Sequence, residues 1–272
     1  MDGKLQSGRR EATLTGERTS MQVDLKGKVA LVTGGARDIG RAVSLALAES
    51  GASVAINYHA SADRATSVVK EIESQGGKAI AVRADVTSST DVNSMVETVA
   101  HELGGRIDIL VNNAGGLLAR KKLDEMDEKF WDDVIALNLK SVFLVTKAVV
   151  PRMSDGGAIV NLSSLAARDG GGGGALAYSA AKGAVLTLTR GLSKELAPKK
   201  IRVNCVSPGM IDTTFHDTFT APEVRKAVAG RTSVGREGTS EDVANSVLFL
   251  ASDASAYITG ESIEINGGIY FV

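Results

Sequence analysis

Short apolar runs that alternate with amphipathic segments constrain the fold of this chain more than any other feature of its sequence. Runs such as KVALVT (residues 28–33) and SVAINY (residues 53–58) are rich in β-branched residues and short enough to be buried strands. A segment with apolar residues at helical spacing follows the first run and is closed by Gly51. The alternation continues along the chain, which predicts a parallel sheet covered by helices on both faces.

The complete pattern predicts a doubly wound, Rossmann-like α/β fold with a seven-stranded parallel sheet flanked by about six helices. The other strands are expected at residues 78–86, 106–115, 156–164, 201–209 and 262–267. The helices are expected at residues 39–51, 61–77, 88–105, 127–152, 178–196 and 240–251. Residues 210–235 are less regular. Ligands of such sheets bind at the carboxyl ends of the strands, so we expect the site there.

Composition favours one soluble domain. The 272 residues are 43% hydrophobic and carry a formal net charge of -1, which suits a single α/β domain and gives no electrostatic basis for a nucleic-acid partner. No composition shift follows residue 23, so we predict one catalytic domain over residues 23–272. No apolar run reaches the roughly 18 residues of a membrane span, and no membrane association is expected.

The first residues are polar and lack the apolar core of a secretory signal. We therefore expect residues 1–22 to form a mobile N-terminal extension, with Met21 as a candidate natural start, and we expect a cytoplasmic protein. The single cysteine, Cys205, lies in an apolar run and predicts a buried, inert thiol. The three histidines show no metal-ligand spacing, so no metal site is expected.

The segment TGGARDIG (residues 33–40) lies between the first strand and the first helix. Gly34 allows a tight turn there, and Gly40 allows the helix to pack closely on the strand. Ile39 and Gly40 open the helix, whose N-terminal amides and dipole favour a phosphate group. The segment therefore predicts the turn that holds the pyrophosphate of a dinucleotide.

The same turn bears on which dinucleotide is bound. The second strand ends at Asn57 without the acid that NAD-selective sites often place there, and Arg37 in the turn is available to a 2′-phosphate. This favours NADP(H) over NAD(H). Asp38 complicates the choice, because its carboxylate could pair with Arg37 or repel the extra phosphate. We expect it to fold back on amides of its own helix or to pair with Arg37, which leaves the pyrophosphate free.

A tyrosine and a lysine lie four residues apart on a predicted helix. Tyr178 and Lys182 therefore share one helix face. A nearby ammonium stabilises phenolate and lowers the tyrosine pKa, so that the hydroxyl can exchange a proton with a substrate oxygen. Ser163 and Ser164 end the fifth strand, 14 to 15 residues before Tyr178, and are expected in the same cleft.

These motifs together resemble the short-chain dehydrogenase/reductase family in its single-domain form of about 250 residues. The resemblance runs from about Leu25 to Gly268. The matching pieces, in chain order, are TGGARDIG, ADV (84–86), NNAG (112–115), Asn138, SS (163–164), YSAAK (178–182), PG (208–209) and NGG (266–268). Asp38 departs from the pattern, because it occupies the position of the middle glycine in the family's turn.

The resemblance implies an NAD(P)(H)-dependent oxidoreductase that interconverts a carbonyl and an alcohol by hydride transfer. Tyr178 matches the catalytic acid/base, and Lys182 the residue that lowers its pKa and holds the nicotinamide ribose. Ser164 matches the serine that polarises the substrate carbonyl, with Ser163 a packing neighbour. Asn138 matches the asparagine that holds a water in a proton relay to Lys182.

Further positions are implied for the cofactor. Asp85 and Val86 resemble an adenine-binding pair, and the residues after the fourth strand resemble a cofactor wall. The segment after the sixth strand resembles the one that meets the nicotinamide carboxamide and the phosphates. The predicted cofactor-binding residues are Gly34, Arg37, Asp38, Ile39, Gly40, Asn57, Asp85, Val86, Asn112, Ala114, Gly115, Tyr178, Lys182, Pro208, Gly209, Ile211 and Thr213.

Three segments, residues 116–126, 165–176 and 210–232, are expected to set the substrate, but they do not name it. The run Arg120-Lys121-Lys122 suits an acidic carrier or an acyl phosphopantetheine, or is a solvated charge run. The run Gly170–Gly174 is either a flexible wall beside the site or a surface insertion.

The family reading leaves several activities open. The substrate is expected to be a small-molecule carbonyl or alcohol. The chain is most like a 3-oxoacyl-carrier-protein reductase, with a sugar or polyol dehydrogenase and a general ketone reductase as alternatives. An epimerase or dehydratase relative usually carries a longer carboxyl-terminal region. A non-catalytic nucleotide-binding redox sensor would be favoured by loss of the tyrosine, lysine or serine, all of which are present. Family members pair the long helices at residues 127–152 and 178–196, so a homotetramer is expected.

Overall fold

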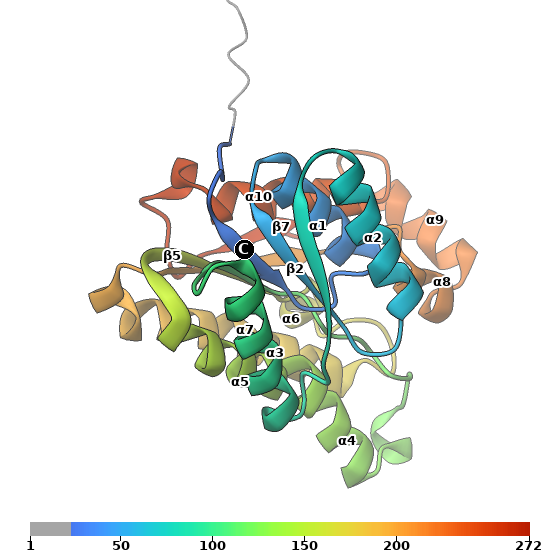
Figure 1. The fold of residues 1–272 in the computed structure, drawn as a ribbon. Helices are drawn as coiled ribbons and strands as arrows, with labels where there is room; N and C mark the ends of the chain where they lie inside the picture. Colours follow the sequence, from blue (N-terminus) through green and yellow to red (C-terminus); the bar gives the residue numbers. More distant parts are fainter. Residues whose placement is uncertain (1–22) are drawn as a thin grey trace, which may run out of the picture.

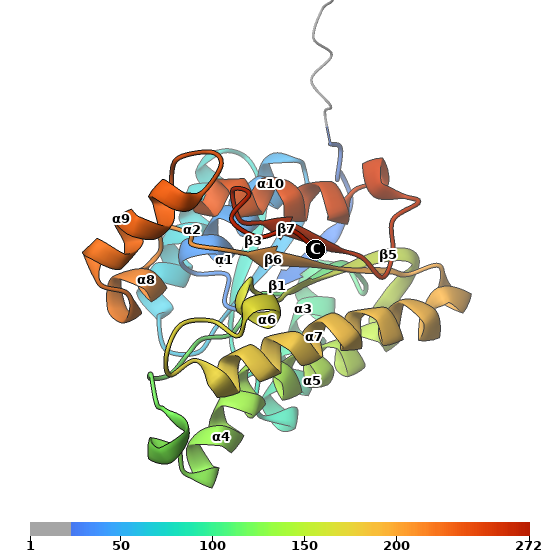
Figure 2. The ribbon, with the colours of Figure 1, turned by 180° about the vertical axis from the view of Figure 1, so that it is seen from behind.

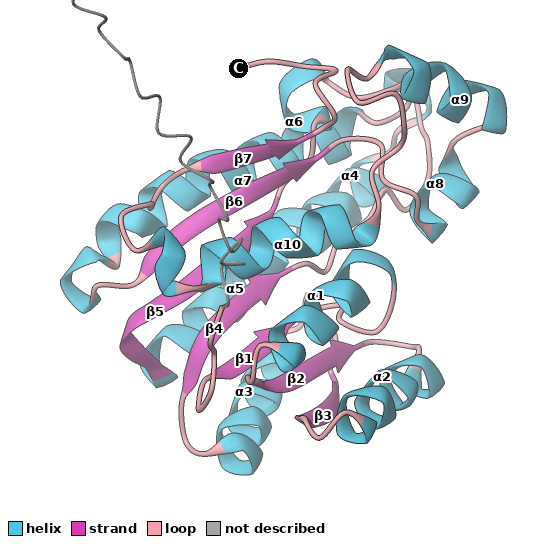
Figure 3. Ribbon diagram, turned by 90° about the horizontal axis from the view of Figure 1, so that it is seen from above, coloured by secondary structure: helices cyan, strands magenta, loops and turns pink. Residues whose placement is uncertain are grey.

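A computed structural model of the protein describes residues 23–272, and the extension predicted over residues 1–22 lies outside the described residues. Seven parallel strands form one sheet in the order β3-β2-β1-β4-β5-β6-β7, which confirms the predicted fold class. Figure 1 shows the fold, and Figure 3 shows the strands side by side. The chain leaves β1 towards β2 and β3 on one side, and later returns to place β4 on the other side of β1. The strands are β1 (Val29–Val32), β2 (Ser53–Tyr58), β3 (Lys78–Arg83), β4 (Ile107–Asn112), β5 (Met153–Leu162), β6 (Arg202–Pro208) and β7 (Ser262–Ile265).

Helices cover both faces of the sheet, as the continuous apolar strands predict (Figure 3). The first layer consists of α1 (Asp38–Glu49), α2 (Ala62–Ser74) and α10 (Ser240–Ala251). The second layer consists of α3 (Ser89–Leu103), α5 (Ser141–Val149) and α7 (Leu176–Glu195). Successive strand residues divide between the two cores: Val32 packs under the first layer, while Leu31 packs under the second.

The helix predicted over residues 127–152 is continuous but not uniform. It begins as α4 (Glu128–Ile135), widens into a π-helical segment (Ala136–Lys140), and continues as α5 into a final 3₁₀ turn (Val150–Arg152). By length and composition alone this helix could cross a membrane. Its valines, however, are buried in the cores of the domain, so it is a core helix.

Short helices occupy segments that the sequence pattern left irregular. The segment after β6 forms α8 (Thr214–Phe219) and α9 (Pro222–Arg231), and α6 (Ala166–Asp169) follows β5. Figure 2 shows α8 and α9 side by side at one end of the molecule, and Figure 3 shows them beyond the arrowheads of the strands. Their apolar periodicity is weak because no residue of either α8 or α9 is buried.

Candidate active site

The carboxyl ends of β1, β4, β5 and β6 are neighbours, because these strands lie next to one another in the sheet. The glycine turn follows β1, the NNAG segment follows β4, the paired serines follow β5, and the PG segment follows β6. The sheet order reverses between β1 and β4, which is where ligands bind in folds of this type. The topology therefore gathers at one edge the motifs that the sequence presents in separate segments.

The glycine turn is held from below by a buried side chain of β2. The backbone N–H of Gly34 donates to Asn57 Oδ1 over 3.2 Å, and Asn57 Nδ2 donates to the Ala84 carbonyl over 3.2 Å. Gly34 has φ of +62°, which favours glycine. A Cβ at Gly40 would lie 2.2 Å from the Gly34 carbonyl oxygen, so only glycine permits this approach of helix and turn. Asn57 therefore supports the cofactor turn from inside the fold.

Two residues absent from the predicted set join the β1 turn to the β4 segment. The Thr33 hydroxyl accepts hydrogen bonds from the backbone N–H groups of Asn113 and Ala114, each over 3.0 Å. The Asn113 amide donates to the carbonyls of Thr33 and Gly34 over 2.9 and 3.0 Å. Both residues lie inside motifs quoted for the family resemblance, which was the available signal. They fix two walls of the cleft relative to each other.

Asp38 adopts a conformation that few side chains accept. It has φ of +49°, and Arg37, in extended conformation, precedes it as the N-cap of α1. Its carboxylate accepts hydrogen bonds from the Thr214 hydroxyl over 2.5 Å and from the Thr214 backbone N–H over 3.2 Å. Among the described residues it bonds no amide of its own helix, so that expectation is corrected. The second expected partner, Arg37, places Nε 3.8 Å from Asp38 Oδ2.

The four predicted catalytic residues come together around one side of the cleft. Tyr178 is half-buried, and its hydroxyl lies near enough to Ser164 to interact with it. The Ser164 hydroxyl also accepts from the Ala166 backbone N–H over 3.1 Å, which fixes its position. Ser163 instead donates to the Lys182 carbonyl over 2.8 Å and takes the packing role expected of it.

Lys182 is 4% exposed and lies beside the asparagine of the π-helical segment. Its Nζ donates to the Leu162 carbonyl over 2.8 Å and lies 5.7 Å from the centroid of the Tyr178 ring. A Cβ on Gly115 would lie 2.8 Å from Asn138 Oδ1 and 3.1 Å from Lys182 Nζ, so both side chains reach the same backbone position. Asn138 also exchanges hydrogen bonds with the Gly116 backbone, at 2.9 Å to its N–H and 2.8 Å to its carbonyl.

Burial controls the protonation of the tyrosine and the lysine. It raises the pKa of the Tyr178 hydroxyl, and the hydrogen bond with Ser164 only partly offsets this effect. The direction is opposite to the lowering expected from Lys182, because the effect of burial is the largest one. Burial also lowers the pKa of Lys182 to about 8, with a small opposing effect from Cys205. The raised pKa keeps the tyrosine hydroxyl protonated at neutral pH.

The arrangement fits a nicotinamide dinucleotide. Lys182 is a buried ammonium with three N–H donors, and the Leu162 carbonyl is its hydrogen-bond acceptor among the described residues. Further oxygen acceptors, such as ribose hydroxyls, would stabilise its charged form. The close approach of Gly34 and Gly40 leaves room for phosphates at the N-terminus of α1.

Several predicted cofactor residues lie at the strand ends but are engaged in other contacts. The Asn112 amide is buried and donates to Asn161 over 2.8 Å and to Thr146 over 3.1 Å. Val86 is a core residue. Asp85 accepts from the backbone and the hydroxyl of Thr87 over 2.8 and 2.7 Å. Their cofactor contacts stay predictions.

The segment after β6 is anchored to its surroundings mainly by backbone contacts. Leu165 N–H donates to the Pro208 carbonyl over 2.8 Å, and Gly209 N–H to the Ile265 carbonyl over 2.9 Å. The Thr213 hydroxyl donates to the Ile211 carbonyl over 3.1 Å, and Ile211 is 3% exposed. Pro208, Gly209, Ile211 and Thr213 lie at the start of the segment that carries α8, and their contacts with the nicotinamide and the phosphates stay predictions.

Arg120 joins the three segments that were expected to set the substrate. Its Nη1 donates to the Gly173 carbonyl over 2.8 Å, and its Nε donates to the Phe219 carbonyl over 2.9 Å. Lys121 N–H donates to the Gly174 carbonyl over 3.2 Å. Arg120 is exposed, as a solvated charge run implies, but it also bonds the glycine run and α8. The two readings of the glycine run stay predictions.

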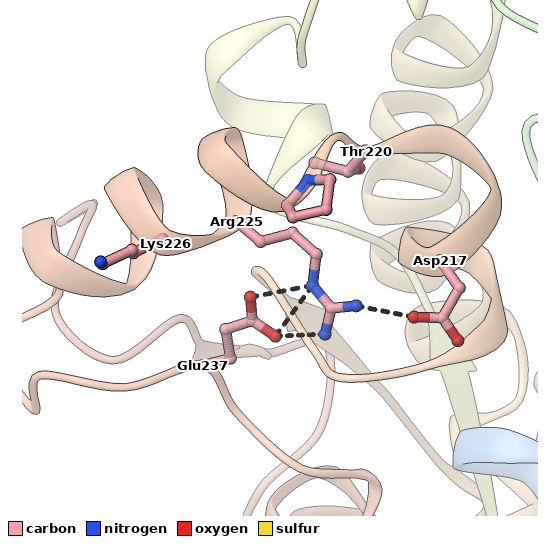
Figure 4. Close-up of a pocket in the computed structure, with 6 residues that line it drawn as sticks. Asp217, Thr220, Arg225, Lys226 and Glu237 are labelled. Carbon is pink, nitrogen blue, oxygen red and sulfur yellow. Dashed lines mark hydrogen bonds and ion pairs between the residues drawn. The ribbon is translucent and has the colours of Figure 1, made fainter.

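A surface pocket of about 420 Å³ lies beside α8 and α9 rather than at the catalytic residues. Figure 4 shows Arg225 at its centre with Asp217 and Glu237. Arg225 also pairs with Asp212, so three carboxylates surround one guanidinium. The ion pair of Arg225 with Asp217 ties α9 to α8, while Lys226, which also lines the pocket, has no ion-pair partner among the described residues.

Comparison with known proteins supports the same reading. A family model described as enoyl-(acyl carrier protein) reductase matches residues 34–270. The 3-oxoacyl-(acyl-carrier-protein) reductase FabG of Staphylococcus aureus is 42% identical over 245 residues, which cover 89% of this chain and 98% of that protein.

Comparison with solved structures supports the same reading of the fold and the site. A dehydrogenase/reductase from Sinorhizobium meliloti superposes with a TM-score of 0.87 at 36% identity, covering 92% of this chain and 98% of the other. A blue fluorescent protein from a metagenomic library, solved with NADPH, gives 0.85 at 37% identity, covering 91% and 100%. The chain therefore belongs to the short-chain dehydrogenase/reductase family and is an NAD(P)-dependent oxidoreductase that most resembles 3-oxoacyl-carrier-protein reductases.

Proposed function

We propose that the protein reduces 3-oxoacyl thioesters to 3-hydroxyacyl thioesters with NADPH. The observation that carries this proposal is the grouping of Ser164, Tyr178 and Lys182, in which Lys182 Nζ lies 5.7 Å from the centroid of the Tyr178 ring and burial raises the pKa of the tyrosine. A tyrosine that stays protonated at neutral pH suits proton donation to a ketone oxygen. The likeness to 3-oxoacyl-carrier-protein reductases supports the substrate class.

The chain's own residues supply binding and proton transfer. Ser164 and Tyr178 present their hydroxyls to the substrate carbonyl oxygen, and Tyr178 gives it a proton. Lys182 holds ribose hydroxyls and stabilises the resulting phenolate, and Asn138 beside it holds the water through which the proton is replaced. The bound dihydronicotinamide supplies the hydride.

An aromatic surface beside Tyr178 favours an acyl substrate over a sugar. The Phe215 ring lies 6.0 Å from the Tyr178 ring, centroid to centroid, and 5.2 Å from the Phe219 ring. Both phenylalanines are half-buried on α8. Such a surface suits the alkyl chain of an acyl group and offers no hydrogen bonds to polyol hydroxyls.

The preference for NADPH over NADH rests on the second strand and the glycine turn. Asn57 ends β2 where NAD-selective sites often carry an acid, and the Arg37 side chain is 57% exposed. Arg37 Nη1 donates to the Thr214 hydroxyl over 3.1 Å, an exposed contact that a phosphate could replace. The NADPH-bound structural neighbour is consistent with this preference.

The proposed function is tested with a substrate panel. 3-Oxoacyl thioesters, simple ketones and sugars are assayed with NADPH and NADH by following absorbance of the reduced nicotinamide. We expect the highest kcat/KM with 3-oxoacyl thioesters and NADPH. In Tyr178→Phe we expect kcat to fall by about 10²- to 10⁴-fold with little change in NADPH affinity. Unchanged turnover would refute the assigned proton donor.

We also propose a cytoplasmic homotetramer. Trp131 on α4 and Phe143 on α5 are 38% and 49% exposed, and Tyr257 and Phe271 near the carboxyl terminus are more exposed still. Two separate apolar surfaces suit two kinds of contact between copies. Light scattering after size-exclusion chromatography tests the assembly, and cell fractionation tests the location. A monomer at micromolar concentration would contradict the assembly.

A further inference from the structure

Helix α8 has little of its own to hold it in place. It spans six residues, none of them buried, and its N-cap residue, Thr213, makes no side-chain capping bond. The first N–H groups of a helix need acceptors, and a carboxylate there is favourable because it faces the positive end of the helix dipole. The position of α8 must therefore be set by contacts from other segments.

Asp38 provides the missing acceptor from the cofactor turn. Its carboxylate takes the backbone N–H of Thr214 over 3.2 Å and the Thr214 hydroxyl over 2.5 Å, although the residues are 176 positions apart. Asp38 has φ of +49° at a position where the family's turn has glycine. Glycine would adopt this conformation without strain. The aspartate supplies a carboxylate, but its positive φ costs conformational energy.

Phe215, the residue after Thr214, lies beside the proposed proton donor, Tyr178. Phe215 places its ring 6.0 Å from that of Tyr178 and packs against Phe219 in turn. Displacement at the start of α8 therefore moves the aromatic surface beside the proton donor. The far end of α8 is held separately by Arg120, which binds the Phe219 carbonyl over 2.9 Å.

We propose that Asp38 is a positioning residue: it caps α8 from the cofactor turn and so holds Phe215 beside Tyr178, where the acyl chain of the substrate binds. The substrate part of this inference rests on the proposed function. The cap itself depends only on Asp38 and Thr214. It links the turn that receives the dinucleotide to the helix that receives the substrate.

The kinetic test separates the cap from the charge of Asp38. Asp38→Gly removes both hydrogen bonds without backbone strain, and Thr214→Val removes one while leaving the carboxylate. With a 3-oxooctanoyl thioester and NADPH, we expect KM to rise about tenfold in Asp38→Gly and about threefold in Thr214→Val, with kcat changed less than twofold. Thr214→Ser keeps the hydroxyl and should restore the wild-type KM. Because the carboxylate is lost, the Kd for NADPH should not rise in Asp38→Gly.

A second measurement tests the cap without any substrate. Millisecond hydrogen–deuterium exchange of the ligand-free protein should show severalfold faster exchange of the amides of residues 214–217 in Asp38→Gly. The amides of α10 should not change, because that helix has its own capping box, formed by Thr239 and Asp242. Unchanged exchange in residues 214–217 overturns the cap, as does a Thr214→Ser variant as impaired as Thr214→Val. If no acyl thioester is turned over while the exchange changes as expected, the proposed substrate fails and the cap stands.

Discussion

The cofactor side and the substrate side of the cleft are held together by different kinds of interaction. On the cofactor side, Thr33 and Asn57 are 2% exposed, and each makes several hydrogen bonds to backbone groups of neighbouring strands. On the substrate side, α8 and α9 contain no buried residue and are held by Arg120, Arg225 and Asp38 through exposed or half-buried polar contacts.

The difference shows how one scaffold can keep its cofactor and change its substrate. A buried hydrogen bond is costly to lose, because the group left behind has neither partner nor water. An exposed ion pair contributes little to stability, so its residues can be replaced. The substrate side can therefore vary while the cofactor side stays constant. The following predictions test this contrast, from the largest expected effect to the smallest.

Asn57→Ala should destabilise the protein most among the changes considered. It leaves the Gly34 N–H and the Ala84 carbonyl without their partner inside the fold. We expect a loss of about 1–3 kcal/mol in the free energy of unfolding, together with weaker NADPH binding. Urea unfolding and cofactor fluorescence titration measure the two effects. A wild-type stability would show that the turn does not depend on this support.

Lys182 should make stability rise with pH. Its pKa is lowered to about 8 in the folded protein, so between pH 8 and the ordinary lysine range the unfolded chain binds a proton that the folded protein has released. The unfolding free energy of the wild type, relative to Lys182→Met, should therefore increase by up to about 1.4 kcal/mol per pH unit. Urea unfolding of both proteins from pH 7 to 9.5 checks this. A constant difference would show that the lysine is not desolvated.

Arg37→Ser should reduce cofactor discrimination rather than stability. The Arg37 side chain is 57% exposed, so its loss costs the fold little. We expect kcat/KM with NADPH to fall about tenfold relative to that with NADH, because a charge-assisted contact to the 2′-phosphate is lost. Arg152→Ser, which removes an exposed ion pair with Glu97, is the matched control. An equal loss with both cofactors would contradict the selecting role.

Arg225→Met should have the smallest effect on stability although it removes three ion pairs. The Arg225 side chain is 18% exposed and contacts two exposed carboxylates, Asp212 and Asp217, and the less exposed Glu237. We expect a change of about 1 kcal/mol or less in the free energy of unfolding, with a severalfold rise in KM as α9 loosens. If Arg225→Met destabilised the protein more than Asn57→Ala, the contrast between the two sides would be wrong.

The sequence predicts most of the fold because the sheet is all parallel and buried. Burial of both faces makes each strand a continuous apolar run, and burial of one face makes each helix amphipathic. β2 and α10 end at the residues where these sequence patterns end. The order of motifs along the chain also predicts that Ser164, Tyr178 and Lys182 share one cleft. These features depend on local pattern and on a topology with few alternatives.

The parts that could not be predicted depend on contacts between distant, exposed segments. The bond between Asp38 and Thr214 joins two loops that no periodicity relates. The link from Arg120 to the glycine run and to α8 is of the same kind. The direction of the Tyr178 pKa shift was missed because it depends on burial in the folded protein, which the spacing of Tyr178 and Lys182 does not report.

The π-helical segment between α4 and α5 limits how this region can change in evolution. There the Ser141 N–H bonds to the Ala136 carbonyl five residues earlier, so the turn holds one residue more than an α-helical turn. Asn138 lies within this wide turn, while Val142 and Val145 beyond it pack into the cores of the domain. Deletion of one residue here would restore ordinary helical pitch and rotate Asn138 away from Lys182. The length of this segment is thus as constrained as the identity of its asparagine.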